Sequence, residues 1–430
     1  MASINAYPSD RALRNWLMPA IIVVAVLVAF LRLNILTATY MGFDAAIYYL
    51  VDFATYNRTV IASNYFNDGF VRRGLGGTIA TLLSPDWRQS TLFFVLFSFV
   101  LLLLPLILLV RSLADRLPPS AVGYMGLVLA FSPQTFLGWS RDPARTDMFV
   151  GGCIALAVVC ALHRKRLAAI AMVLIGMLAH ETAIVFGAPL LLAMNWMDYR
   201  AREIDRRLFV QLALTLTAGV GIILLAQTVL SAPNSAVAAH MLAEVPDSVK
   251  NSQHRLWRDI AIYMAVAGPD ALRTAICANL TANPQYLFMA IAALLVAGVY
   301  GIVFPLRRHW LTWALVMAVP LVFMLLIAND TGRWLKLAVL NGWLVSVFYL
   351  VRGYAVLDND ETWMPLGVAL LMVLLAMGST PYYRVNRIAR NTALTFGYRD
   401  PLPLRVWMDT CDPGWERHVY GVAPPRQPLR

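Results

Sequence analysis

Residues 163–207 read HRKRLAAIAMVLIGMLAHETAIVFGAPLLLAMNWMDYRAREIDRR, and this stretch sets the membrane topology of the chain. About thirty apolar residues lie between two basic clusters, and His180 and Glu181 interrupt them in the middle. A single long helix would place the two basic clusters on opposite sides of a membrane, although basic residues gather on the cytoplasmic side. The sequence therefore predicts a hairpin of two short helices with His180 and Glu181 at the outer turn. Short helices are tolerated where they pack against protein around a polar cavity.

The composition places the chain among polytopic membrane proteins. It has 430 residues, of which 60% are hydrophobic and only 14% are charged, and its mean hydropathy is +0.64. Soluble domains average about 25% charged residues. The net charge of +11 comes mostly from short basic clusters between apolar segments. Such clusters determine membrane orientation, so we expect no nucleic-acid partner.

Outward from the hairpin, apolar segments alternate with polar connections and predict an all-α protein with about eleven transmembrane helices. The basic residues Arg11 and Arg14 precede the first span and predict a cytoplasmic N-terminus in the inner membrane, with that span acting as an uncleaved signal anchor. The predicted spans are Trp16–Leu36, Thr91–Val110, Ala121–Trp139, Met148–Leu162, two within Leu167–Met197, Leu208–Leu230, Tyr286–Phe304, Leu311–Ala328, Leu335–Val351 and Met364–Met377.

This pattern divides the chain into two regions. Residues 1–377 form the predicted transmembrane domain, with a first outer loop at 37–90 and a long, partly helical outer loop at 231–285. Residues 378–430 form a tail rich in proline and arginine, which we expect outside the cytoplasm. We find no internal repeat of the kind that transporters carry.

The first outer loop contains a short apolar segment, Gly74–Leu83. Ten residues cannot cross a bilayer core that needs about twenty, so we expect an interfacial or re-entrant helix. Its glycine run is no phosphate-binding loop, because no Lys-Ser or Lys-Thr follows. The glycines are more typical of close backbone packing.

Polar residues gather at the connections that this topology places on the outer face. Ionisable side chains at membrane depth are costly and mark functional sites. We predict catalytic candidates at Asp44, Asp68, His180 and Glu181, phosphate-binding residues at Arg72, Arg73, Arg141, Arg145 and Arg333, and further polar site residues at Asp142, Asp147 and Asp330.

Several of these residues have two interpretations. Arg141 and Asp142 either serve the site or pair with each other at a helix end. Asp68 lies in an Asn-Asp-Gly turn signature. It pairs with Arg72 or shapes the turn, or else it binds a metal or serves as a second acid. His180 is either a hydrogen-bonded structural residue or a catalytic one. The HETAI segment lacks a second histidine, so it is no zinc-protease motif.

Arg72 and Arg73 are the most specific feature, because two adjacent guanidinium groups beside an amphipathic segment suit a phosphate or diphosphate. The sequence leaves open whether a divalent cation takes part.

An outward loop with Gly42-Phe-Asp44 and Tyr48-Tyr49 shortly after the first span, followed by interfacial helices and many spans, resembles the GT-C superfamily. Its members are integral membrane glycosyltransferases that use polyprenyl-phosphate-linked sugars. The resemblance implies that Asp44 is the general base for an acceptor hydroxyl and that Arg72, Arg73 and Arg333 neutralise the leaving phosphate. It implies a lipid-linked sugar donor, a glycan or lipid acceptor, and a role in building cell-envelope polysaccharide.

Three alternatives remain at this point. Asp44 also suits the N-cap of a helix over Ala45–Leu50. The protein could instead be a polysaccharide polymerase or ligase that consumes polyprenyl-diphosphate glycans. A transporter or flippase is the alternative from another class, but transporters bring ionisable residues to the middle of the membrane.

The four cysteines fall into two pairs. Cys153 and Cys160 lie in an apolar span, where they simply pack. Cys277 and Cys411 lie in the long outer loop and the outer tail, which we expect in an oxidising compartment. We therefore predict a disulfide that clamps the tail over the site.

Overall fold

The structure is a computed structural model. It describes residues 61–84, 87–131, 146–244, 255–277, 279, 285–304, 309–327, 331–355 and 404–420. Asp44, Arg141, Asp142, Arg145 and Asp330 lie outside the described residues, as do the predicted spans Trp16–Leu36 and Met364–Met377.

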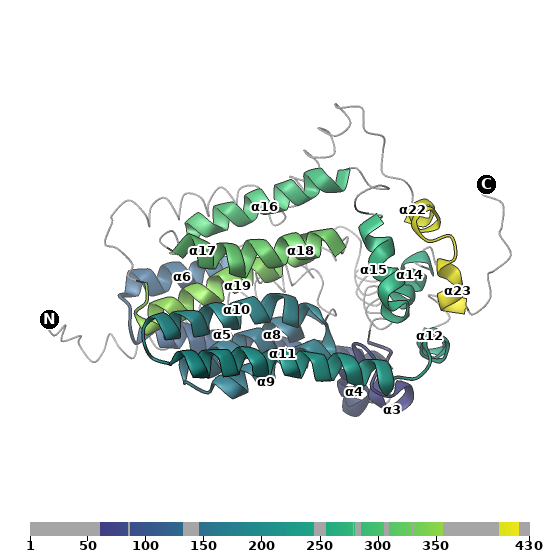
Figure 1. Ribbon diagram of the computed structural model, residues 1–430, viewed down its shortest axis with the longest axis horizontal. Helices are drawn as coiled ribbons and strands as arrows, with labels where there is room; N and C mark the ends of the chain where they lie inside the picture. Colours follow the sequence, from purple (N-terminus) through teal and green to yellow (C-terminus); the bar gives the residue numbers. More distant parts are fainter. Residues whose placement is uncertain are drawn as a thin grey trace, which may run out of the picture.

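The described chain is a bundle of long helices with a group of short helices at one end (Figure 1). The bundle helices run along the long axis of the molecule, whereas the short helices lie together at the end of the bundle where α11 and α18 end. The bundle helices are α5 (Trp87–Ala114), α6 (Pro119–Phe131), α8 (Asp147–Leu162), α9 (Arg166–Ala179), α10 (Thr182–Arg200), α11 (Arg206–Val229), α16 (Gln285–Val303), α17 (Trp310–Trp313), α18 (Val319–Ile327) and α19 (Thr331–Arg352). A short π-helix, Ala314–Ala318, joins α17 to α18.

The predicted hairpin is confirmed. Helix α9 ends at Ala179, and α10 begins at Thr182, so only His180 and Glu181 form the turn. Small residues allow the two helices to pack closely: a Cβ added at Gly187 would come within 2.8 Å of Val173. As a consequence, the basic clusters before α9 and after α10 lie at the same end of the bundle, opposite the turn.

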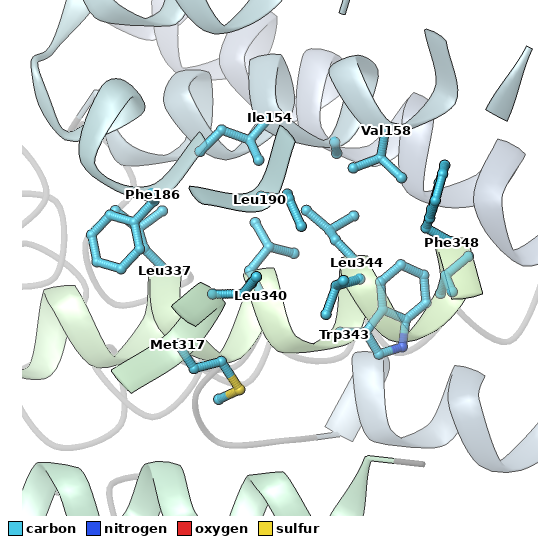
Figure 2. Close-up of a cluster of buried hydrophobic side chains, with 14 of the residues drawn as sticks. Ile154, Val158, Phe186, Leu190, Met317, Leu337, Leu340, Trp343, Leu344 and Phe348 are labelled. Carbon is cyan, nitrogen blue, oxygen red and sulfur yellow. The ribbon is translucent and has the colours of Figure 1, made fainter. Parts of the chain in front are cut away.

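Helix α19 is the centre of the bundle. Its most apolar window is 89% buried, whereas that of α11 is only 11% buried. Figure 2 shows how Leu340, Leu344 and other side chains of α19 lie toward Ile154 and Leu190 of α8 and α10. Trp343 points the other way, and its Nε1 donates to the carbonyl oxygen of Met125 on α6 at 3.0 Å. The amide of Asn341, which is fully buried on α19, donates to the carbonyl oxygens of Phe186 at 2.7 Å and Val316 at 3.4 Å.

Four of the described helical segments are long and apolar enough to cross a membrane: Phe93–Ala114, Arg206–Val229, Trp310–Ile327 and Arg333–Arg352. Four shorter apolar helices, Gly74–Leu83, Asp147–Leu162, Arg166–Ala179 and Ala293–Val303, accompany them. The chain is therefore helical and suited to a membrane, as predicted. The count of eleven spans stays a prediction.

The short helices form what we call the cap. It consists of α3 (Tyr65–Asp68), α4 (Gly74–Leu83), α12 (Asn234–Ala243), α14 (Arg255–Val266), α15 (Gly268–Cys277), α22 (Leu404–Cys411) and α23 (Trp415–Tyr420). Helix α4 has the bounds that the sequence predicts. The described part of the tail does not stand apart, because Met408 and Trp415 are buried in one apolar cluster with Tyr263 from the long outer loop.

A disulfide joins α15 to α22. It links Cys277 to Cys411 across 134 residues of sequence, with Cα atoms 5.7 Å apart. Two hydrogen bonds reinforce this connection: the Tyr263 hydroxyl donates to Asp412 at 2.7 Å, and the Tyr420 hydroxyl donates to Asp259 at 2.6 Å. The predicted bridge is confirmed, and Cys153 and Cys160 are free.

Candidate functional site

Six of the predicted site residues meet where the cap joins the bundle. They come from four segments: the loop before α4, the start of α8, the α9–α10 turn and the start of α19. These residues are Arg72, Arg73, Asp147, His180, Glu181 and Arg333.

Glu181 holds both adjacent arginines of the first loop. Its Oε1 accepts hydrogen bonds from Nη2 of Arg72 and Nη2 of Arg73, and its Oε2 accepts from Nε of Arg73 at 2.9 Å. Burial opposes ionisation of this carboxyl, but the charges of Arg72 and Arg73 outweigh it and hold the pKa of Glu181 well below its usual range. The carboxylate therefore stays charged at neutral pH.

The backbone before α4 is shaped to place these arginines. Asn64 accepts hydrogen bonds from the amides of Phe66 and Asn67 and so caps α3. Arg73 then has a φ of 64°, in the left-handed region that non-glycine residues rarely adopt. Such a conformation costs roughly 1–3 kcal/mol and persists where the surroundings determine it. Here the hydrogen bonds of the Arg73 side chain to Glu181 hold the residue in this conformation.

Glycine brings α4 against the preceding chain. A Cβ at Gly77 would overlap the carbonyl oxygens of Ser63 and Ile61. A Cβ at Gly76 would lie 3.5 Å from the Thr146 side chain at the start of α8. The predicted role of the glycine run in close packing is confirmed, and that packing places the arginine pair beside α8 and α9.

His180 is buried at the turn and is held through one ring nitrogen. Its Nδ1 lies 3.2 Å from the amide of Thr182 and 3.1 Å from the Thr182 hydroxyl, so it accepts from the amide. Its ring packs against Trp334 with centroids 6.3 Å apart. Burial and the neighbouring charge of Arg73 lower the pKa of His180 well below its usual value. The imidazole is therefore neutral at neutral pH.

Asp147 and Arg333 form a second ion pair, between Oδ2 of Asp147 and Nε of Arg333. The Arg333 guanidinium also lies 4.7 Å from the ring centroid of Trp334. Within the described part of the chain, three buried polar atoms beside this pair make no hydrogen bond: Asp147 Oδ1, Thr146 Oγ1 and Trp334 Nε1. Buried polar atoms without partners are rare, so this corner can accept a polar ligand.

Asp68 has a different role from the pairing with Arg72 that the sequence suggested. Its Oδ2 accepts from the amide of Asn64 at 2.9 Å and lies 3.0 Å from Nδ1 of His240 on α12. The turn-shaping interpretation is correct, since Gly69 directly after it has a φ of 66°. The Arg72 pairing is wrong, because Arg72 reaches Glu181 instead. Asp68 ties the first loop to α12.

The charges of the assembled group favour an anion. Three guanidinium groups face two carboxylates while His180 is neutral, which leaves one positive charge. Among the described residues, Arg72 is paired only through Nη2 and Arg333 only through Nε, so their remaining N–H groups are available to a ligand. In the same part of the chain, no three His, Cys, Asp or Glu side chains gather in a way that would hold a metal ion.

Sequence reasoning missed Trp334, which contacts both Arg333 and His180. The Arg-Trp pair at residues 333–334 was the available signal, since arginine stacks on aromatic faces. No family model matches this chain, and no curated protein or solved structure matches it either.

Proposed function

We propose that this protein is a membrane glycosyltransferase that moves a sugar from a polyprenyl-phosphate-linked donor to a glycan or lipid acceptor at the capped end of the bundle. One observation carries the proposal. Arg72, Arg73 and Arg333 converge with two carboxylates at the end of an apolar bundle, where a lipid-anchored phosphate can reach them.

The charge of the arginines suits the leaving group of this reaction. During transfer, the acceptor oxygen bonds to the anomeric carbon, the bond from that carbon to the phosphate oxygen breaks, and the phosphate leaves with the bonding electrons. Fixed guanidinium donors stabilise this developing charge. Arg72 is partly exposed and keeps unused donors, so it suits this role.

The general base must accept the acceptor's proton. Glu181 is a poor base because its pKa is low and both of its oxygens are bonded to arginines. It positions Arg72 and Arg73. The base assigned by resemblance, Asp44, stays a prediction. The open oxygen of Asp147 and the hydroxyl of Thr146 suit the binding of a sugar hydroxyl near Arg333.

A polymerase or ligase that consumes polyprenyl-diphosphate glycans would use the same arginines and remains the second candidate. A transporter has less support. In the described bundle helices, ionisable residues lie near the helix ends, for example Asp147 and Asp198, rather than at the middle of the bundle. Transporters characteristically place them at the midplane.

The test is a transfer assay with the purified full-length protein in nanodiscs and a labelled polyprenyl-phosphate sugar. We expect R72Q to lower kcat about a hundredfold and D44N to lower it by about a hundredfold or more. The matched control is R164Q, which removes an exposed arginine paired with Glu203 at the opposite end and should keep full activity. Wild-type protein that forms no product but moves the labelled lipid between leaflets would replace the proposal with the transporter alternative.

A further inference from the structure

A cavity with both polar and apolar lining lies at the other end of the bundle, away from the cap. It has a volume of about 520 Å³ and lies between the end of α10, the start of α17 and the residues after α19. The candidate site involves the opposite ends of α10 and α19, so the two are separate. The side chains that matter for this cavity are Trp196, Arg200, His309, Trp310, Thr312 and Tyr354.

A buried cluster of charged residues lies behind one side of the cavity, because the cavity residue Tyr354 donates to Asp198. Asp198 accepts from Nη2 of Arg166 at 2.6 Å and from the hydroxyl of Tyr354 at 2.7 Å, and it lies 3.9 Å from Nη2 of Arg352. Arg200, which lines the cavity, adds a third guanidinium group at this end, against the single carboxylate of Asp198 in the cluster. This excess of two positive charges favours an anionic ligand.

Two side chains in the cavity have capacity to bind such a ligand. Arg200 makes no ion pair within the described residues, and it is exposed. The ring of His309 lies edge-on to Tyr349 with centroids 5.1 Å apart, which orients the imidazole, and it makes no hydrogen bond in the described part of the chain. A guanidinium with an imidazole is a donor set that suits a phosphate oxygen.

The position of the cavity along the bundle indicates a lipid. Trp310 is 68% exposed and Trp196 is 44% exposed, and exposed tryptophans are enriched at the level of lipid headgroups. On the adjoining surface Leu192 of α10 and Leu315 of the π-helix are exposed apolar side chains. A phosphate in the cavity would therefore have an apolar surface beside it for acyl chains.

We propose that this cavity binds the phosphate headgroup of an anionic phospholipid, with Arg200 and His309 on the phosphate and Trp196 and Trp310 beside the glycerol backbone. The exposed apolar surface and the tryptophans favour a lipid over a soluble phosphate, because a soluble ligand would gain nothing from them. This site is independent of the proposed transfer reaction.

The test is native mass spectrometry of the full-length protein from detergent with added phosphatidylglycerol or phosphatidylcholine. We expect the wild type to retain phosphatidylglycerol preferentially, R200Q to retain it at least about fivefold less, and R200E to retain still less. The matched control is R207Q, which removes an exposed arginine at the same basic end that does not line the cavity, and it should behave as the wild type.

Two outcomes overturn the proposal. Equal retention by R200Q and R207Q would mean that the basic end attracts lipid without a specific site. Displacement of phosphatidylglycerol by glycerol 3-phosphate or inorganic phosphate at similar concentrations would assign the cavity to a soluble phosphate.

A H309Q variant with weakened retention and an unchanged circular dichroism spectrum supports the assigned contact independently. These readouts require no transferase activity, so the failure of either proposal leaves the other standing.

Discussion

At the scale of single residues, the candidate site is a set of ion pairs in which three guanidinium groups face two carboxylates, so one positive charge is left over. Glu181 binds two arginines, whereas Asp147 binds one and has an oxygen without a partner among the described residues. Charges removed from water are costly unless they are paired and hydrogen-bonded. The pairs therefore stabilise the ends of four segments, and the uncompensated positive charge is left for a ligand.

The first prediction concerns Glu181→Gln. The substitution keeps the size of the side chain but removes the charge that holds Arg72 and Arg73. Charge-assisted hydrogen bonds contribute about 1.5–3 kcal/mol. Because the side chain is 30% exposed, we expect a smaller loss of unfolding free energy, about 1–2 kcal/mol. The matched control is Glu203→Gln, which removes an exposed ion pair and should cost under about 0.5 kcal/mol. Equal thermal shifts in the two variants would contradict the assignment.

The second prediction concerns pH and His180. Its pKa is lowered in the folded state, so below the ordinary histidine pKa of about 6.5 the unfolded chain binds a proton that the folded chain does not. Stability should therefore fall as the pH drops from about 6.5, with a slope of up to about 1.4 kcal/mol per pH unit. His180→Gln should flatten this slope between about pH 6.5 and pH 5. Thermal unfolding measured across this range checks it, and an unchanged slope would mean that His180 is charged in the folded protein.

At the scale of elements, glycine contacts decide how the short helices meet the long ones. Gly77 lets α4 lie against the backbone of residues 61–63, and Gly187 lets α10 lie against Val173 of α9. By contrast, no atom of the described residues lies within 4 Å of a Cβ added at Gly221 on α11. Of these three glycines, the packing around the site requires the first two and not the third.

The third prediction uses this contrast. Gly77→Ala should destabilise the protein by more than about 2 kcal/mol, since overpacking against backbone cannot be relieved by a side-chain rotation. Gly221→Ala should be neutral or stabilise it by up to about 1 kcal/mol, because alanine is the better helix former. Both effects are measurable as shifts in the unfolding midpoint in detergent. Comparable stability of the two variants would mean that α4 does not pack in this way.

At the scale of the whole molecule, the two ends of the bundle are chemically different. One end carries the cap, its disulfide and the paired charges, whereas the other carries the basic clusters and the lipid cavity. Disulfides persist in oxidising compartments, and basic clusters stay in the cytoplasm. Both tendencies favour the capped end on the outside of the membrane, and this orientation stays a prediction.

The fourth prediction tests that orientation with single cysteines and an impermeant thiol reagent in intact cells. A cysteine at Ser231, which pairs with Gly69 beside the cap, should be labelled. A cysteine at Leu162, the last residue of α8 at the basic end, should be labelled only after the membrane is permeabilised. Labelling at residue 162 alone in intact cells would reverse the orientation.

The sequence by itself determined the helical membrane architecture, the hairpin turn at His180 and Glu181, the short helix Gly74–Leu83 and the Cys277–Cys411 disulfide. These features follow from local quantities: the length of an apolar run, the position of basic clusters and the compartment that each connection occupies. A chain that alternates sides in this way brings alternate connections to the same end. That rule alone anticipated the grouping of six of the twelve candidate residues; five others lie outside the described residues, and Asp68 contacts His240 instead.

Only the tertiary structure decided which charges pair. Glu181 meets Arg72 from 109 residues away, Asp147 meets Arg333 from 186 residues away, and Asp68 meets His240 rather than the nearby Arg72. The choice depends on how each helix is rotated and how closely it approaches its neighbours, and side-chain volume sets both through contacts such as those at Gly76 and Gly77. Sequence spacing carries no information about these long-range contacts, because they form between elements that fold separately and meet only on packing.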